Sequence, residues 1–354
     1  YPLLDGKVVG CPHHLLEPQR ANIFPYSSAF TNINDFSLTV TDNASISPEG
    51  SNNATSIIPN VSNTVHYLSL SNNSTGTVTF SIYAKANGYN YLFLHLYDGS
   101  NGRAWFNLEN GVIETADSSI SANIEKMPNG WYRCIITRVL SGNLIQADIA
   151  VSNSDNTTSF SGDGASGIYI YGAQLEAGSF PTSYIKTSGN PTTRLGEAAS
   201  GSGNAATFND SEGILMAEIA ALDLLSDVSR TIMLTSSDGL NYVNIYWQSN
   251  GVLTVFNNVN GVNTVLFQET LNDITTFHKA SLKWSSQGYE LWVNGLKLAN
   301  STNTSVPTGL SELMFNWYGD IRYFHGKTKQ IQYFDTTDID LEELTSWDSF
   351  SDMA

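Results

Sequence analysis

The chain has 354 residues and a formal charge of −17, from 16 Lys and Arg against 33 Asp and Glu. Its length fits two domains of about 150 to 200 residues each. Its negative charge repels phosphate backbones and anionic lipid, so we expect no nucleic-acid partner and no membrane partner. Charged residues are only 14% of the chain and aromatic residues 11%, a composition that favours an all-β fold.

The predicted elements divide the chain into four segments. Residues 1–24 are punctuated by prolines and predict an extended arm. Short alternating runs between turn clusters over 25–187 predict a first β-sandwich. Residues 188–206 hold almost no large apolar side chain and predict a linker, and 207–354 form a second strand-rich block. The chain begins at Tyr1 rather than Met, so we expect a fragment or a processed piece of a longer protein.

Two local features complete the expected organisation. Thr336 to Trp347 is the best helix candidate, with Thr337 as its expected N-cap. Two cysteines exclude a disulfide framework, and Cys11 and Cys134 either form one bridge or are free buried thiols.

Strands of the first sandwich carry two different faces. In YNYLFLHLYD (89–98), three leucines alternate with aromatic and His side chains, because successive side chains of a strand point to opposite faces. The run RAWFNLE (103–109) alternates in the same way, and the turn at 98–102 joins the two into a hairpin. These strands therefore share an aliphatic face and a face of aromatic and hydrogen-bonding side chains.

The aromatic faces allow three interpretations. Tyr and Trp rings stack on the apolar faces of sugars while neighbouring polar groups bond hydroxyls, so one interpretation is a glycan-binding surface. The others are a subunit interface and an ordinary packed layer. The candidate glycan-binding residues are, in the first sandwich, Tyr83, Tyr91, His95, Tyr97, Arg103, Trp105 and Asn107, and, in the second, Tyr242, Tyr246, Trp292 and Tyr318.

Catalytic motifs are sparse, and we expect no enzyme. No strand carries the closely spaced carboxylates that retaining glycosidases need. The six His residues do not cluster with Cys or carboxylates at the spacing of a zinc site. One alternative stays open: a polysaccharide lyase needs a Tyr or His base beside an Arg or Asn that neutralises a uronate. The side chains that would form it are Tyr83, His95, Arg103, Arg133 and Asn107.

Several strings resemble virion proteins. GCPHHLLEPQRANIFPYSSAFT (10–31) is similar to an arm found in structural and fibre proteins of phages of environmental bacteria. YIYGAQLEAGSFPTSYIKT (169–187) resembles the closing strand of phage-borne sandwiches akin to carbohydrate-binding modules. LWVNGLKL (291–298) and the segment 324–347 resemble a laminin-G or concanavalin-A-like domain. Two places depart from these patterns: His13 and His14 stand where the arm often has small or apolar residues, and Lys186 stands where proline is common.

The resemblance implies two tandem jelly-roll β-sandwiches of concanavalin-A-like type on the surface of a virion, outside the cell. It implies a fibre, spike or head-decoration protein that attaches to host surface glycan, assembles as a trimer, and joins other virion proteins through the arm or a missing upstream part. A purely structural assembly module, a depolymerase and a secreted bacterial adhesin remain alternatives.

The resemblance requires no cofactor but allows one structural Ca²⁺, since such sandwiches often hold one away from the sugar face. Glu176 and Asn22 are the candidate ligands. The alternative for Glu176 is that it only bonds backbone amides.

Overall fold

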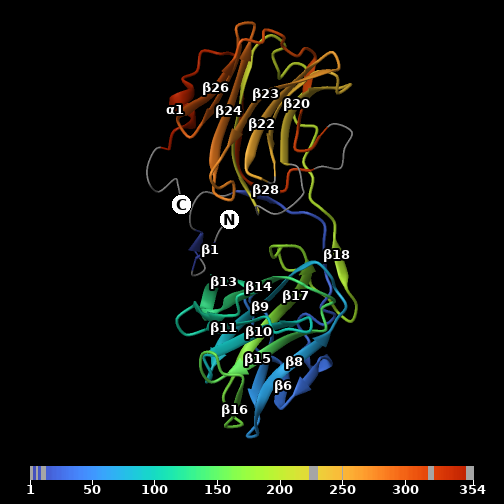
Figure 1. The fold of residues 1–354 in the computed structure, drawn as a ribbon, viewed down its shortest axis with the longest axis vertical. Helices are drawn as coiled ribbons and strands as arrows, with labels where there is room; N and C mark the ends of the chain where they lie inside the picture. Colours follow the sequence, from blue (N-terminus) through green and yellow to red (C-terminus); the bar gives the residue numbers. More distant parts are fainter. Residues whose placement is uncertain are drawn as a thin grey trace. The chain divides into compact units, whose positions relative to one another are not determined.

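The computed structural model describes residues 13–222, 230–248, 250–317 and 323–347, together with the backbone of 3–4 and 7–8. Contacts divide the chain into two compact units (Figure 1). Unit 1 comprises Tyr1–Gly10 and Gln19–Leu195, and unit 2 comprises Cys11–Pro18 and Gly196–Ala354.

Unit 1 is a sandwich of two antiparallel sheets. The β10 sheet contains, in spatial order, β12 (Val112–Ala116), β11 (Arg103–Asn107), β10 (Tyr91–Tyr97), β15 (Gln146–Ser152), β8 (Asn63–Ser71) and β16 (Ser159–Ser161), and β5 (Asn34–Phe36) also pairs with β8. The β9 sheet contains β13 (Ser121–Lys126), β14 (Tyr132–Val139), β9 (Thr77–Asn87), β17 (Gly167–Ala177), β7 (Asn52–Pro59) and β6 (Leu38–Ile46).

Alternation along the strands builds the core of unit 1. The leucines at 92, 94 and 96 are fully buried and pack with Phe80 and Ile82 of the facing sheet. Cys134 is a free thiol in the same core, while Cys11 lies outside the described residues. The aliphatic faces predicted for 89–98 and 103–109 are therefore confirmed, and the opposite faces of these strands point away from the core.

Unit 2 is a second sandwich. The β19 sheet contains β26 (Leu296–Ser301), β25 (Gly288–Val293), β24 (His278–Ser285), β19 (Gly213–Ala221), β28 (Gly326–Phe334) and β3 (His14–Leu16). The β21 sheet contains β23 (Val262–Thr270), β22 (Val252–Val259), β21 (Tyr242–Trp247), β20 (Arg230–Ser236) and β27 (Leu310–Met314). Their core includes Leu215, Ile245 and Trp284, all fully buried.

The arm and the linker both contain strands. The sequence placed residues 1–24 outside both sandwiches, but His14–Leu16 extends the β19 sheet beside β28. Within unit 1, β4 (Arg20–Asn22) pairs with β18 (Thr192–Arg194), which lies in the segment predicted as a linker. The shorter elements are β1 (Leu3–Leu4), β2 (Lys7–Val8) and the 3-10 turns η1 (Phe30–Asn32) and η2 (Pro128–Gly130).

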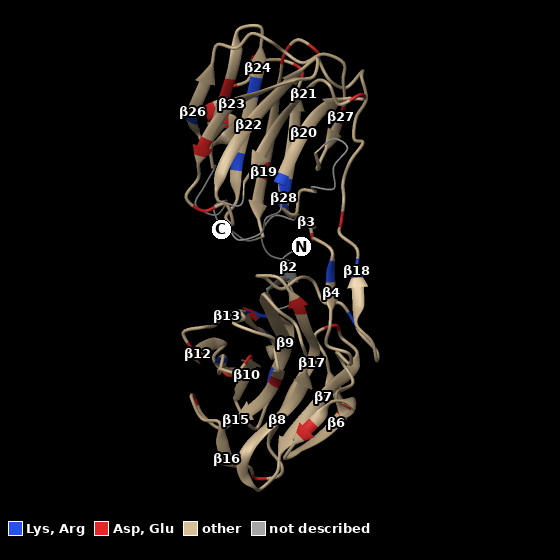
Figure 2. Cartoon of the chain, turned by 45° about the vertical axis from the view of Figure 1, so that its right-hand side comes forward, with Lys and Arg blue, Asp and Glu red and all other residues tan. Residues whose placement is uncertain are grey.

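The C-terminal helix is present but shorter than predicted. Helix α1 spans Leu341–Thr345, and Asp340 rather than Thr337 caps it by accepting hydrogen bonds from the backbone N–H groups of Glu342 and Glu343. The all-β class, the two sandwiches and the short C-terminal helix are confirmed. Figure 2 shows that Lys, Arg, Asp and Glu occupy few positions along the ribbon of either unit. Within the described ranges, no helix is long and apolar enough to cross a membrane.

Candidate functional site

The residues of unit 1 predicted for glycan binding or for the alternative lyase site lie on two different outer faces. Tyr83 and Arg133 belong to β9 and β14, whereas Tyr91, His95 and the other candidates belong to β10 and β11. The two sheets face each other across the core, so their outer side chains point in opposite directions. The lyase set that would combine Tyr83 and Arg133 with His95 therefore cannot assemble.

The outer face of the β9 sheet is covered by the chain itself. The Tyr83 ring lies 6.3 Å from that of Tyr171 and 6.4 Å from that of Tyr184. The Arg133 guanidinium lies 5.5 Å from the Tyr83 ring and donates a 2.7 Å hydrogen bond to the carbonyl of Thr182. Tyr83 is thus part of a packed layer, which is one of the three interpretations left open by the sequence.

Trp105 is also unavailable as a stacking platform. Its side chain is 0% exposed, its ring lies 5.2 Å from that of Phe93, and its Nε1–H donates to the carbonyl of Thr157 at 3.1 Å. The loop after β15 therefore covers the ring. This corrects the expected role of Trp105, because a sugar needs an open ring face.

Asn107 supports a turn rather than facing solvent. Its Nδ2 donates to Glu114 at 3.1 Å and to the Tyr91 hydroxyl at 3.3 Å, and its Oδ1 accepts the backbone N–H groups of Glu109 and Asn110. The side chain is buried, and its bonds hold the turn between β11 and β12. Tyr91 is half-buried and takes part in the same network.

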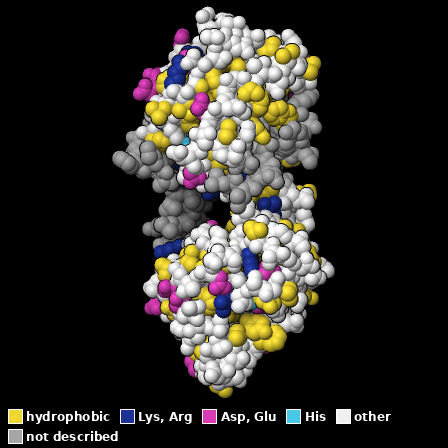
Figure 3. Space-filling model, in the orientation of Figure 1, with side chains coloured by type: hydrophobic (Ala, Val, Ile, Leu, Met, Phe, Trp, Pro, Cys, Tyr) yellow, Lys and Arg dark blue, Asp and Glu magenta, His cyan; other side chains and the backbone are white. Residues whose placement is uncertain are grey.

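The remaining candidates of unit 1 frame a hollow of about 270 Å³ on the outer face of the β10 sheet. Strands β8, β10, β11 and β15 supply most of its walls. Figure 3 shows hydrophobic side chains gathered over β8 and β15 on this face, beside charged atoms. The lining residues are Val65, Tyr67, Phe93, His95, Asn101, Arg103, Gln146, Asp148 and Thr158.

Strand register places the lining side chains in two adjacent rows. One row is polar and crosses four strands, since His95 pairs with Arg103 and with Asp148, and Asp148 pairs with Ser69. The neighbouring row is apolar and contains Trp105, Phe93, Ala150, Tyr67 and Phe36. Outward positions two residues apart along a strand lie about 7 Å apart, so the polar row runs alongside the aromatic rings.

The polar row is linked by short hydrogen bonds. Asp148 accepts from the Ser69 hydroxyl at 2.6 Å through one oxygen and contacts His95 Nδ1 at 2.9 Å through the other. The side chains of His95 and Asp148 are only 14% and 9% exposed. His95 Nε2 has no hydrogen-bond partner among the residues that the structure describes.

Arg103 and Tyr67 complete the electrostatics of the hollow. Arg103 Nε contacts Asp117 at 3.0 Å, and its guanidinium lies 5.2 Å from the Trp105 ring. Burial and, to a smaller extent, the negative charge of Asp148 raise the pKa of Tyr67, so this hydroxyl stays protonated. The Tyr67 ring stacks on Phe36 with centroids 4.5 Å apart.

Sequence reasoning selected His95, Tyr97 and Arg103 but missed Tyr67, Asn101 and the pair Gln146 and Asp148. Tyr97 belongs to this region, because its ring lies 5.8 Å from that of His95. The outward positions of Gln146 and Asp148 could be read from the alternation in their strand. Their proximity to His95 depends on the pairing of β15 with β10, which the sequence pattern does not specify.

The candidates of unit 2 are likewise divided between sheets. Tyr242 and Tyr246 lie on β21, where the Trp317 ring packs edge-on at 5.7 and 6.2 Å. Tyr318 lies outside the described residues. Trp292 lies on β25 of the other sheet and donates from Nε1 to Glu290 at 3.1 Å. The unit 2 candidates therefore form no single surface.

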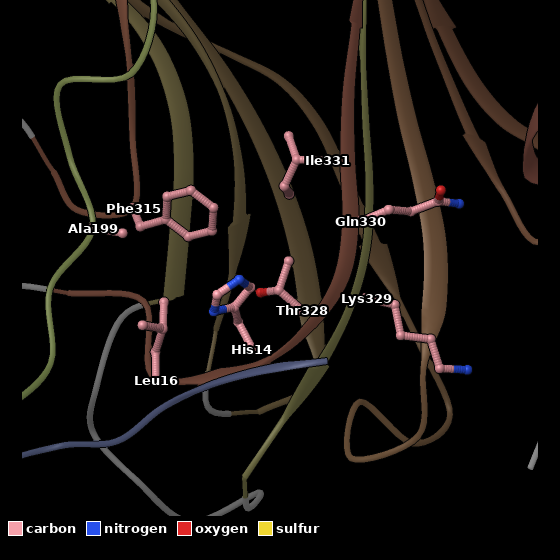
Figure 4. A pocket seen from close by; sticks show the side chains of 8 residues that line it. All are labelled: His14, Leu16, Ala199, Phe315, Thr328, Lys329, Gln330 and Ile331. Carbon is pink, nitrogen blue, oxygen red and sulfur yellow. The ribbon is translucent and has the colours of Figure 1, made fainter. Parts of the chain in front are cut away.

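A further hollow of about 310 Å³ lies beside the arm strand of unit 2 (Figure 4). Figure 4 shows Leu16, Phe315 and Ile331 turned inward around His14, with the ammonium group of Lys329 directed away. Its lining is mostly apolar and lacks a convergent set of polar groups. It resembles a packing gap between β3 and the core more than a sugar site.

The side chains of both calcium candidates, Asn22 and Glu176, already accept hydrogen bonds from donors of the protein itself. Asn22 Oδ1 accepts the backbone N–H groups of Phe24 and Leu175. Glu176 is fully buried and accepts from Gln174 and from both the N–H and the hydroxyl of Thr182. Ca²⁺ would have to displace these donors, so the contacts do not support the calcium expectation. Over the described ranges, no three His, Cys, Asp or Glu side chains form a metal-binding group.

Comparison with known proteins finds distant structural similarity only. No protein-family model and no curated protein matches the chain. A heptameric SAP-like pentraxin from Limulus polyphemus is 12% identical, with a TM-score of 0.31, over 38% of this chain and 67% of its own. Domains LG4-5 of the mouse laminin α1 chain are 10% identical, with a TM-score of 0.30, over 80% of this chain and 89% of theirs.

A third similar structure is a candidate carbohydrate-binding protein from Bacteroides ovatus. It is 13% identical, with a TM-score of 0.30, over 92% of this chain and 83% of its own. Likenesses at this level carry no inference about a ligand. The chain is an all-β protein of two sandwiches with distant similarity to laminin-G, pentraxin and carbohydrate-binding structures.

Proposed function

We propose that the chain is a non-enzymatic glycan-binding protein and that the hollow on the β10 sheet is its binding site. The observation that carries this proposal is the register that sets the polar row beside the aromatic row. A sugar presents C–H faces that pack on rings and hydroxyls that exchange hydrogen bonds with amides, hydroxyls and charged groups. Tyr67 supplies a ring, while Asn101, Gln146 and His95 supply polar groups.

The proposed setting is the surface of a phage particle, where the chain would attach to host glycan. This part of the proposal rests on the resemblance of 10–31 and 169–187 to phage fibre proteins. Single sugar sites bind weakly, so a trimer present in several copies would gain affinity through avidity. The arm, or a part upstream of Tyr1, would join other virion proteins.

A second candidate function is an assembly interface on the same face. Phe36, which stacks on Tyr67 on this face, is 47% exposed. Exposed apolar side chains beside a polar hollow are typical of protein–protein contacts as well as ligand sites. The two functions differ in what covers Tyr67 in the assembled particle.

Binding to a glycan array and to host cells tests the proposal, with Tyr67→Ala as the variant. We expect about a fivefold loss of binding, because a ring contact contributes about 1 kcal/mol. Tyr169→Ala is the matched control, since this half-buried Tyr lies on β17 of the opposite sheet. Thermal melting and light scattering report stability and oligomeric state. A wild type that binds no glycan, with a Tyr67→Ala variant that dissociates, would support the assembly interface instead.

A further inference from the structure

We infer that the open edge of strand β28 binds an extended peptide segment of another protein, and that this segment alternates apolar and basic side chains. The surface belongs to unit 2 and is independent of the glycan-binding hollow proposed for unit 1. Three features define it: the length of β28 that the arm strand leaves unpaired, and one hollow on each side of that edge.

Strand β28 is an edge strand over most of its length. Arm strand β3 pairs with it only from Gly326 to Thr328, and no segment in the described ranges pairs with the same side of residues 329–334. Proteins commonly protect such an edge with proline or with free charges. The stretch KQIQYF (329–334) has no proline and one charge, an ammonium that lies 3.3 Å from Glu218. The edge therefore offers backbone N–H and C=O groups to an added strand.

The apolar hollow of about 310 Å³ beside the arm strand lies on the core side of this edge (Figure 4). Ile331 packs against the core of unit 2, and Thr328 lines the same hollow. Thr328 is 6% exposed, and its hydroxyl has no hydrogen-bond partner among the residues that the structure describes. In an added strand, the side chain opposite Ile331 would share its inward direction and lie near Leu16 and Phe315. An apolar side chain suits that position.

A larger hollow of about 480 Å³ lies on the outer side of the same edge, between β28 and the segment that leads into α1. The carboxylates that line it are on the exposed residues Asp338, Asp340 and Glu343. None of the three forms an ion pair within the described part of the chain. Lys279 also lines the hollow, but it is 9% exposed and donates to the carbonyl of Ser346 at 2.8 Å. The outer hollow is therefore acidic.

Strand alternation links the two hollows to one ligand. Gln330 and Gln332 line the outer hollow, whereas Ile331 between them lines the inner one. An added strand would alternate in the same way, with an apolar side chain opposite Ile331 and basic side chains opposite the two glutamines. The chain itself has a formal charge of −17, so a second copy would be repelled by the acidic wall. A basic segment of a different protein suits it better.

Synthetic peptides added to the full chain test the inference. The probe is acetyl-Thr-Lys-Leu-Lys-Thr-Lys-Thr-amide, labelled for fluorescence anisotropy. Its controls are a scrambled peptide of the same composition, in which Leu has no Lys neighbour, and a version with Glu in place of Lys. We expect the probe to bind at least about tenfold more tightly than either control. Hydrogen exchange across residues 329–334 should slow when the probe binds, because an added strand protects the edge amides.

Two pairs of variants locate the contacts. Ala199→Leu fills the inner hollow and should weaken binding by about tenfold or more, whereas Ala198→Leu, at an exposed neighbour that does not line it, should not. Glu343→Gln should weaken binding by about threefold, as expected for an exposed ion pair. Glu342→Gln is the charge-matched control, because Glu342 is exposed on the same helix but does not line the outer hollow.

Melting curves identify variants that fail to fold, and the Glu343 pair tests the surface without changing an apolar contact. Equal binding of the probe and the scrambled peptide would overturn the inference, as would unchanged exchange across residues 329–334. Equal affinity of Ala199→Leu and Ala198→Leu would also overturn it. Self-association of the wild type that Ala199→Leu abolishes would place a second copy on the edge and overturn the assignment to another protein.

Discussion

Asp98, at the turn between β10 and β11, has a side chain with no exposed surface. Arg138 Nη2 lies 3.0 Å from it, and the backbone N–H groups of Ser141 and Ser100 donate to it at 2.8 and 3.2 Å. Burial opposes ionisation, but these hydrogen bonds outweigh it and hold the pKa of Asp98 well below its usual range. The carboxylate therefore stabilises the fold above the ordinary Asp pKa, and this contribution declines as the pH falls toward the lower folded value.

We predict that Asp98→Asn lowers the free energy of unfolding at about pH 7 by about 3 kcal/mol, because Arg138 loses its buried partner. The difference from wild type should shrink as the pH falls from about 5 to about 2, where the unfolded carboxyl group takes up its proton. Urea unfolding at a series of pH values measures it. Glu125→Gln, at an exposed position on β13, is the control and should have little effect. A pH-independent difference would contradict the explanation.

At the scale of residues, the sequence predicted which face of a sheet a side chain occupies, but not whether a distant segment buries that side chain. Alternation placed His95, Tyr97 and Arg103 away from the core, as the structure has them. It placed Trp105 on the same face, but the loop that buries Trp105 lies about fifty residues further along the chain, at Thr157. Strand periodicity fixes which face a side chain occupies, whereas its exposure depends on distant segments.

At the scale of elements, strand β3 shows that the arm serves the fold of unit 2. Leu16 packs against the core beside β28, whereas Leu15 on the same strand is 36% exposed. Alternation on a short edge strand produces this contrast. Substitutions of Leu16 and Leu15 can therefore distinguish the stabilisation that comes from apolar packing of β3 from the stabilisation that comes from its backbone pairing with β28.

We predict that Leu16→Asp weakens the docking of β3, because a carboxylate would replace a packed apolar side chain. Hydrogen exchange in the full chain should show faster exchange in peptides from β28, by about tenfold or more. Leu15→Asp is the matched control and should leave protection in β28 nearly unchanged. Equal effects of both variants would mean that the side chain of Leu16 does not anchor the strand.

Neither the docking of β3 nor the pairing of β18 could be predicted from local pattern. His14 pairs with Thr328, far away in sequence, and no short-range signal specifies such a partner. The segment 188–206 lacks large apolar side chains and was predicted as a linker, yet Thr192–Arg194 pairs with β4 through backbone hydrogen bonds. The helix was predicted too long, because its N-cap is Asp340, three residues after the expected cap Thr337.

At the scale of the whole molecule, the two sandwiches have separate apolar cores. Phe80 and Leu94 lie in the core of unit 1, and Leu215 and Ile245 lie in that of unit 2, all fully buried. The fold class and the division into two strand-rich blocks could be predicted, since composition, alternation and turn spacing recur along the whole sequence. The candidate site could be predicted only in part, since it depends on how four strands pair.

Separate cores predict separate unfolding transitions. A large-to-small change in one core costs about 4 kcal/mol, and a unit of this size loses about 2 to 4 °C per kcal/mol. Phe80→Ala should therefore lower one transition in differential scanning calorimetry by about 10 °C and leave the other in place, and Leu215→Ala should do the reverse. Each variant is the control for the other. If both transitions moved together in both variants, the units would unfold as one cooperative body, and the division into two cores would have no thermodynamic counterpart.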